Sequence, residues 1–159
     1  MTRKSVILPA ALFAAAGIGV WVVAQDPART TAAPQAVDLA GGERLYGEYC
    51  ASCHGANLEG QPDWRSPGPD GVLPAPPHDE TGHTWHHPDG TLFDYTKLGG
   101  EAALTQLGVE FQSGMPGFGD QLTDAQIWDI LAYIKSTWPD RQREGQAARS
   151  DAARQHQGN

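Results

Sequence analysis

Residues 50–55 read CASCHG, which places Cys50 and Cys53 three positions apart with His54 directly after the second cysteine. Such a triplet is typical of a redox dithiol, of half a zinc site or of a covalent haem attachment. Cys50 and Cys53 are the only two cysteines in the chain. A four-cysteine zinc site is therefore excluded, and the histidines lack the spacing that a Cys₂His₂ finger requires.

The residues before Cys50 distinguish between the two remaining interpretations. A thioredoxin-type dithiol follows a buried strand, but residues 38–50 contain no β-branched run, and their apolar positions recur at helical spacing. On one helical turn, Cys50, Cys53 and His54 point to the same side. Two thiols can then bond the vinyl groups of one porphyrin edge while the imidazole ligates the iron. The motif therefore predicts one covalently bound haem c per chain.

The first 24 residues begin with Arg3 and Lys4 and continue with an uncharged stretch from Val6 to Ala24. As a helix, this stretch would be about 28 Å long, close to the thickness of the hydrocarbon core of a bilayer. Two interpretations stay open: a signal peptide that is removed, and an uncleaved membrane anchor with Trp21 at the interface. The length favours the anchor. Both place the remaining chain on the periplasmic side of the bacterial inner membrane, anchored or soluble.

The rest of the chain divides by composition into three parts. Residues 25–37 are small, polar and proline-bearing, which predicts a flexible linker. Residues 38–139 have the size of one domain, and residues 140–159 lack an apolar stripe, which predicts a disordered polar tail. The net charge of −8 disfavours nucleic acid as a partner. We expect a monomeric soluble domain, held at the membrane only if the N-terminal segment is uncleaved.

Within residues 38–139 the patterns predict helices and no strand. The loop of residues 55–87 is rich in Gly, Pro, Asp and His, and we expect it to wrap around the haem. Trp128, Ile130, Tyr133 and Ile134 are expected to be buried against the first helix or the haem. The predicted helices cover about 39–52, the stretch from Pro88 to a Gly99 cap, about 100–108, and a final segment that starts at a Thr123–Gln126 capping box and ends at Pro139.

Met115 is the only methionine besides the initiator, and it stands in the loop SGMPGFGDQL. A lone methionine can simply fill a core. Here three of its neighbours within four positions are glycines, and Pro116 fixes the backbone beside the sulfur. This setting favours Met115 as the second axial ligand of the iron, opposite His54.

These features resemble a class I (monohaem) c-type cytochrome over residues 38–139. The resemblance rests on the spacing of Gly42 and Tyr46 ahead of the CxxCH motif, on the Met115 loop and on the final helix ending in ILAYIKSTWP. It implies an all-α cytochrome c fold, in which the N- and C-terminal helices cross and long irregular loops surround one covalent haem. In this family a glycine lets the two helices approach and aromatic side chains fill the contact. Gly42, Tyr46 and Tyr133 match those positions.

The resemblance also implies two kinds of contact around the haem. The family uses a proline carbonyl to accept a hydrogen bond from the proximal histidine, and Pro76 in LPAPP is the candidate among several prolines. Trp64 and Arg65 are the candidates for contacts to the haem propionates.

Four histidines within the stretch HDETGHTWHHPDG depart from the family pattern: His78, His83, His86 and His87. Three interpretations stay open. The cluster is a solvated or capping group beside a helix start, or His83, His86 and His87 converge on a second metal such as copper. In the third interpretation, one of the four replaces Met115 as an iron ligand.

The resemblance implies an electron carrier that exchanges single electrons with redox protein partners and is not itself an enzyme. Its haem would be held by Cys50 and Cys53 and its iron ligated by His54 and Met115. Two alternatives remain at this stage: a haem subunit of an oxidase or dehydrogenase complex, and a copper-handling cytochrome that uses the histidine loop.

Overall fold

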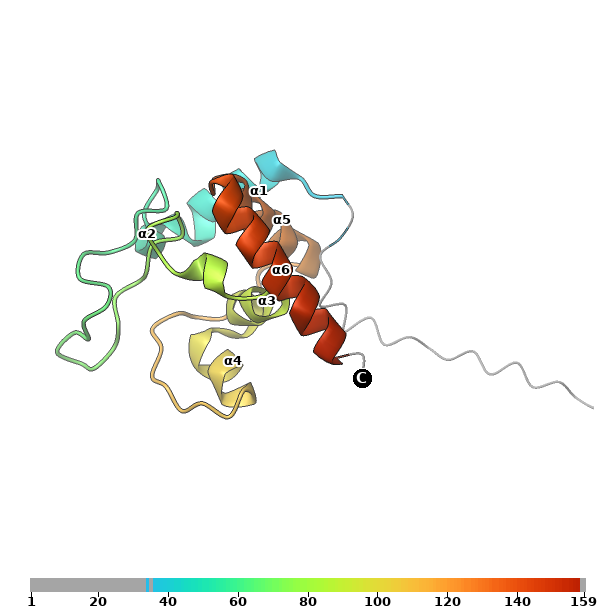
Figure 1. The fold of residues 1–159 in the computed structure, drawn as a ribbon. Helices are drawn as coiled ribbons and strands as arrows, with labels where there is room; N and C mark the ends of the chain where they lie inside the picture. Colours follow the sequence, from blue (N-terminus) through green and yellow to red (C-terminus); the bar gives the residue numbers. More distant parts are fainter. Residues whose placement is uncertain (1–33, 35, 158–159) are drawn as a thin grey trace, which may run out of the picture.

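The computed structural model describes residues 34 and 36–157 (Figure 1). The expected signal peptide or membrane anchor at residues 1–24 and most of the linker at 25–37 therefore lie outside the described residues. None of the described helices combines the length and the apolar character that crossing a bilayer requires.

The described part of the chain consists of α-helices, one 3₁₀ turn and long loops, with no strand (Figure 1). This confirms the predicted all-α class. The expected helix at 39–52 is divided at Cys50 into two helices. The elements are α1 (Leu39–Tyr49), α2 (Ala51–His54), η2 (Thr84–His86), α3 (Asp89–Leu98), α4 (Gly100–Gln106), α5 (Asp124–Ser136) and α6 (Asp140–Gln157).

The helix ends follow the capping chemistry of the sequence. Thr123 and Gln126 form the predicted capping box at the start of α5. Gly99 ends α3 as expected, with a φ of +88° that L side chains rarely adopt. The final family-like helix ends at Ser136, three residues before the predicted Pro139.

Helices α1 and α5 cross in close contact, and Gly42 makes this contact possible. A Cβ added at Gly42 would lie 2.1 Å from the backbone oxygen of Asp129. The backbone N–H of Asp38 donates to the Asp129 carboxylate across the same crossing, at 2.8 Å. Tyr46 and Tyr133 pack beside it with ring centroids 5.6 Å apart. The expected roles of the glycine and the two aromatic residues are confirmed.

Two glycines on α1 give a matched test of this crossing. Gly47→Ala should stabilise the protein by about 0.5–1 kcal/mol, because alanine is the better helix former and no atom lies within 4 Å of the added Cβ. Gly42→Ala should instead destabilise it by about 1–3 kcal/mol through overpacking against backbone. Denaturant unfolding of the two variants checks the opposite signs. Equal effects on the free energy of unfolding would show that α1 and α5 can move apart to accept the added methyl group without loss of stability.

The core is formed mainly by α1, α3 and α5. On α5, Trp128, Ile130 and Ile134 are buried as predicted, but Tyr133 is only half-buried. Phe93 of α3 stacks on Trp128 with ring centroids 4.8 Å apart. The buried apolar side chains continue to the end of the family-like region at Trp138, which is 1% exposed.

The expected disordered tail at 140–159 is wrong for the residues that the structure describes. Asp140–Gln157 form helix α6, drawn in red in Figure 1. The helix has no apolar stripe, but polar side chains attach it to the rest of the domain through hydrogen bonds. Gln146 and Ser150 are 0% and 3% exposed. The Gln146 Nε2 donates to the Asp89 carboxylate at 2.7 Å and to the Ser150 hydroxyl at 3.0 Å.

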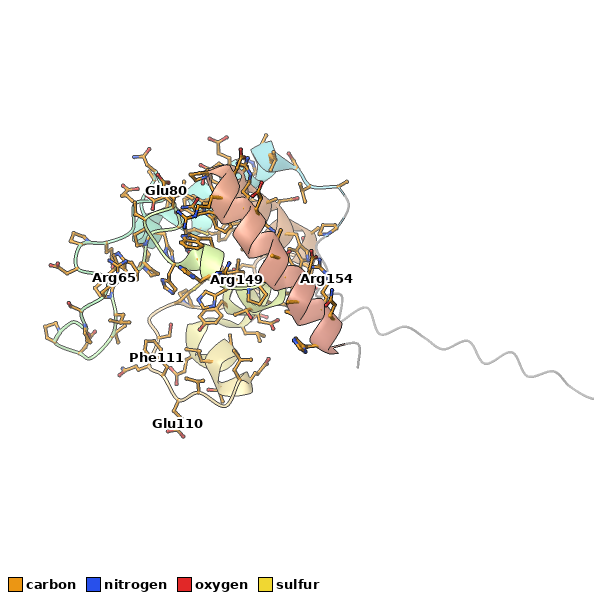
Figure 2. All side chains as sticks on the ribbon, in the orientation of Figure 1. Arg65, Glu80, Glu110, Phe111, Arg149 and Arg154 are labelled. Atoms are coloured by element: carbon orange, nitrogen blue, oxygen red, sulfur yellow. The ribbon has the colours of Figure 1, made fainter. Side chains whose placement is uncertain are left out.

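The Asp89 carboxylate is the centre of this polar contact. It also accepts from the ammonium group of Lys135 on α5, at 2.6 Å. Ser150 accepts the backbone N–H of Asp89 at 3.0 Å. The guanidinium of Arg149 lies 5.9 Å from the ring centre of Trp85 in η2 (Figure 2). Hydrogen bonds thus hold α6 against the start of α3. The sequence of α6 has no hydrophobic periodicity from which this packing could be predicted.

Replacing Gln146 tests whether this buried contact stabilises the fold. Gln146→Ala should lower the free energy of unfolding by about 1–3 kcal/mol, because it removes the hydrogen bonds that Gln146 donates to the Asp89 carboxylate and the Ser150 hydroxyl in a buried site. The exposed Gln155 on the same helix provides the control, since Gln155→Ala should change stability by less than about 0.5 kcal/mol. Equal unfolding free energies for the two variants would mean that the Gln146 contact does not stabilise the fold.

Candidate functional site

The CxxCH motif consists of Cys50, which separates α1 from α2, and the single turn of α2 that follows it. The backbone N–H of Cys50 donates to Tyr46 O at 2.9 Å, and that of His54 donates to Cys50 O at 2.9 Å. Neither cysteine forms a disulfide. Cys50 is buried and Cys53 is exposed, and burial raises the pKa of the Cys50 thiol to about 12. The structure therefore presents two thiols outside any disulfide and one imidazole on a single turn.

The His54 imidazole is buried at 7% exposure, and one of its nitrogens is held by backbone. Nδ1 lies 2.8 Å from the carbonyl oxygen of Pro76, so the protonated Nδ1 donates and Nε2 carries the free lone pair. Burial lowers the pKa of His54, which keeps the ring neutral, although the Pro76 bond opposes this shift. Pro76 is thus the proline that the sequence pointed to, and it fixes the tautomer that a metal ligand needs.

A second imidazole covers one face of His54. The rings of His54 and His78 are stacked, with centroids 3.8 Å apart and planes inclined by 18°. Burial lowers the pKa of His78 well below its usual range, and its Nδ1 is buried without a hydrogen-bond partner among the described residues. Sequence reasoning placed His78 in the histidine cluster and missed this contact. The available signal was its position two residues after Pro76.

The Met115 loop runs against the C-terminal end of α3. The Met115 carbonyl accepts from the backbone N–H of Gly100 at 3.1 Å, and the N–H groups of Phe118 and Gly119 donate to Thr96 O and Lys97 O at 3.0 and 2.9 Å. A Cβ added at Gly117 would lie 2.6 Å from the carbonyl carbon of Leu98. The loop is therefore closely packed backbone against backbone, and Met115 itself is half-buried. Ligation of iron by its sulfur stays a prediction.

The histidine loop does not form the copper site that was one of its three open interpretations. Among the described residues, no group of three or more His, Cys, Asp or Glu side chains could hold a metal ion. The His83 and His87 rings lie close together, with centroids 5.3 Å apart, but each of the three rings also packs on a different aromatic residue. His83 stacks on Trp64 with centroids 5.3 Å apart, and His86 stacks on Trp85 at 3.7 Å. His87 lies 6.3 Å from the ring of Tyr95.

The loop of residues 55–87 holds little regular structure, but hydrogen bonds join two positions within it. Gln61 and Ala75 are joined twice, by a backbone bond from Gln61 N to Ala75 O at 2.9 Å and by one from Ala75 N to Gln61 Oε1 at 2.9 Å. In the segment between them, the guanidinium of Arg65 lies 4.0 Å from the ring centre of Trp64 (Figure 2). Contacts of Trp64 and Arg65 to haem propionates stay a prediction.

The donor set fits a covalently attached haem. Two unpaired thiols three residues apart can bond one porphyrin edge, and the His54 Nε2 is free because Nδ1 is already bonded to Pro76.

The segment that precedes the Met115 loop exposes three large apolar side chains, those of Leu107, Val109 and Phe111. Figure 2 shows Glu110 and Phe111 on the loop that follows α4.

Comparison with known proteins agrees with this geometry. The family model described as "Cytochrome c" matches residues 39–138, which is more than half of the chain. No curated protein and no solved structure matches the chain. Helix α6 lies beyond the matched residues, whereas the CxxCH turn, Pro76 and the Met115 loop lie within them. The chain belongs to the cytochrome c family, whose members bind haem and transfer electrons.

Proposed function

We propose that this protein is a monohaem electron carrier, in which Cys50 and Cys53 hold haem c and His54 and Met115 ligate the iron. The observation that carries the proposal is the hydrogen bond from His54 Nδ1 to Pro76 O, at 2.8 Å. It leaves Nε2 free as a nitrogen donor on the same helical turn as the two thiols. The bound haem supplies the Fe(III)/Fe(II) couple.

The chain's own groups favour electron exchange over catalysis. A histidine and a methionine together fill both axial positions of an iron, so that no position remains for a substrate. A thioether opposite an imidazole favours Fe(II), which raises the reduction potential. The packed backbone around Met115, with Gly99 and Gly117 against their neighbours, would hold the sulfur in place during both oxidation states. The protein is accordingly proposed to be a carrier and not an enzyme by itself.

The proposed place of action is the periplasmic side of the bacterial inner membrane. Support comes from the N-terminal sequence, where Arg3 and Lys4 precede an uncharged stretch of sufficient length to direct export or to act as an anchor. Haem c attachment outside the cytoplasm agrees with such a segment. The proposed partners are other redox proteins that meet the folded domain as a monomer.

A redox titration of the full-length protein, followed by optical spectra, tests this function. The expected result is one haem per chain, a single one-electron transition and a six-coordinate spectrum in both oxidation states. Carbon monoxide added to the reduced protein should leave the spectrum unchanged, because Met115 blocks the iron. Rapid carbon monoxide binding by the wild-type protein would contradict the carrier assignment and indicate an open coordination position.

A further inference from the structure

The face of the proximal imidazole is occupied by a residue whose own position is strongly fixed. His78 stacks on His54 with a centroid separation of 3.8 Å and an interplanar angle of 18°. Its backbone N–H donates to Leu58 O at 2.8 Å, and its carbonyl accepts from Trp138 Nε1 at 2.7 Å. Trp138 is 1% exposed. The His78 backbone is therefore held from both sides.

The His78 ring is restrained as well as its backbone. The ring of Tyr46 meets it edge to face, with centroids 5.9 Å apart and planes inclined by 63°. Tyr46 is 1% exposed and its hydroxyl donates to Gly55 O at 3.1 Å. His78 is itself half-buried, and its ring lies between the edge of the buried Tyr46 ring and the face of His54, so that both neighbours restrict its rotation.

The His78 ring contributes a flat face to this contact as well as volume. His78 Nδ1 is buried and has no hydrogen-bond partner among the described residues. What the imidazole offers beyond volume is a flat aromatic face, and this face lies on His54.

The Pro76 hydrogen bond leaves one motion of His54 unrestrained. A single bond at Nδ1 fixes one edge of the ring, but the ring can still tilt about that edge. A flat neighbour on the ring face opposes such a tilt. The orientation of a ligating imidazole is set by its partners beyond the metal, and this orientation determines how the ligand's orbitals overlap those of the iron.

We propose that His78 is a positioning residue, which fixes the plane of the His54 imidazole by face-to-face packing. This inference rests on the proposed function, in which His54 ligates the haem iron. Pro76 would fix the edge of the ring and His78 its tilt, so that the two residues together define one ligand orientation. Trp138 at the end of the matched region would support this orientation through the His78 carbonyl.

The experiment compares full-length ferric holoproteins by electron paramagnetic resonance and by the hyperfine-shifted NMR signals of the His54 ring. The variants are His78→Leu, which keeps volume but removes the flat face, and His78→Phe, which keeps an aromatic face. His86→Leu is the matched control, because His86 is exposed and stacks on Trp85 instead. His78→Met provides a second apolar variant if His78→Leu does not accumulate as holoprotein.

The expected result is a changed spread of g-values and displaced His54 ring signals in His78→Leu or His78→Met. His78→Phe should restore the wild-type pattern, and His86→Leu should match the wild type throughout. Wild-type values in His78→Leu would overturn the inference, because volume alone would then suffice. A His78→Phe spectrum as far displaced as that of His78→Leu would also overturn it. If wild-type holoprotein shows no hyperfine-shifted His54 signals, the proposed function fails, and the positioning role fails with it.

Discussion

Replacement of His54 by alanine should leave almost no protein carrying haem. His54 belongs to the attachment motif and provides the proposed iron ligand, so one change removes both. In the structure, His54 is also the donor to Pro76 O at 2.8 Å, and alanine abolishes that anchor of the 55–87 loop. The measurement is covalent haem per chain, detected by haem staining after denaturing electrophoresis.

The exposed His86 supplies the control for this change. His86→Ala removes an imidazole that stacks only on Trp85, so its haem content should equal that of the wild type. Cys50→Ala and Cys53→Ala should each reduce the holoprotein sharply, and acid acetone should release the haem from a double variant but not from the wild type. A wild-type haem content in His54→Ala would remove the basis for assigning His54 as a ligand.

Replacement of Met115 should have the second-largest effect, on the iron itself. The oxidised wild-type protein should show the weak near-infrared band of sulfur-to-iron charge transfer, and Met115→Ala should erase it. The reduced variant should then bind carbon monoxide, because its sixth position is open. Absorption spectra of both oxidation states, with and without carbon monoxide, provide the measurement.

Met115→His separates ligand chemistry from loss of structure. The haem should stay six-coordinate, but the reduction potential should fall, because imidazole stabilises Fe(III) relative to a thioether. If wild-type protein lacks the near-infrared band and behaves as a bis-histidine haem, Met115 is core filling. The 78–87 histidine segment would then be the first place to search for the ligand.

The parts of the fold that could be predicted are those fixed by short-range patterns. The capping box at Thr123 and the glycine at the end of α3 act within a few residues, so the sequence shows both partners at once. The Pro76 contact was predictable only through the family resemblance, since 22 residues separate it from His54. Within LPAPP, spacing alone would not have distinguished one proline from another.

The parts that could not be predicted depend on contacts between distant polar groups. Helix α6 was missed because its anchors, Gln146 and Ser150, are ordinary surface residue types that become buried only beside Asp89. The copper hypothesis failed for a related reason. The spacing of His83, His86 and His87 allowed the three rings to converge on a metal, but aromatic residues from other positions, such as Trp64, pack against these rings instead.

The two hydrogen bonds between Gln61 and Ala75 separate the long loop into a part that can vary in length and a part that cannot. They hold the ends of residues 62–74 together, whatever lies between. Doubling the length of such a closed loop costs only about 0.6 kcal/mol of closure entropy. A peptide epitope inserted between Pro67 and Asp70, which are both exposed and lie in the middle of this segment, would therefore leave the Pro76 carbonyl beside His54. An insertion at 76–83 would instead displace the groups that orient the haem ligand, so related chains should differ in length at the former place and keep a constant length at the latter.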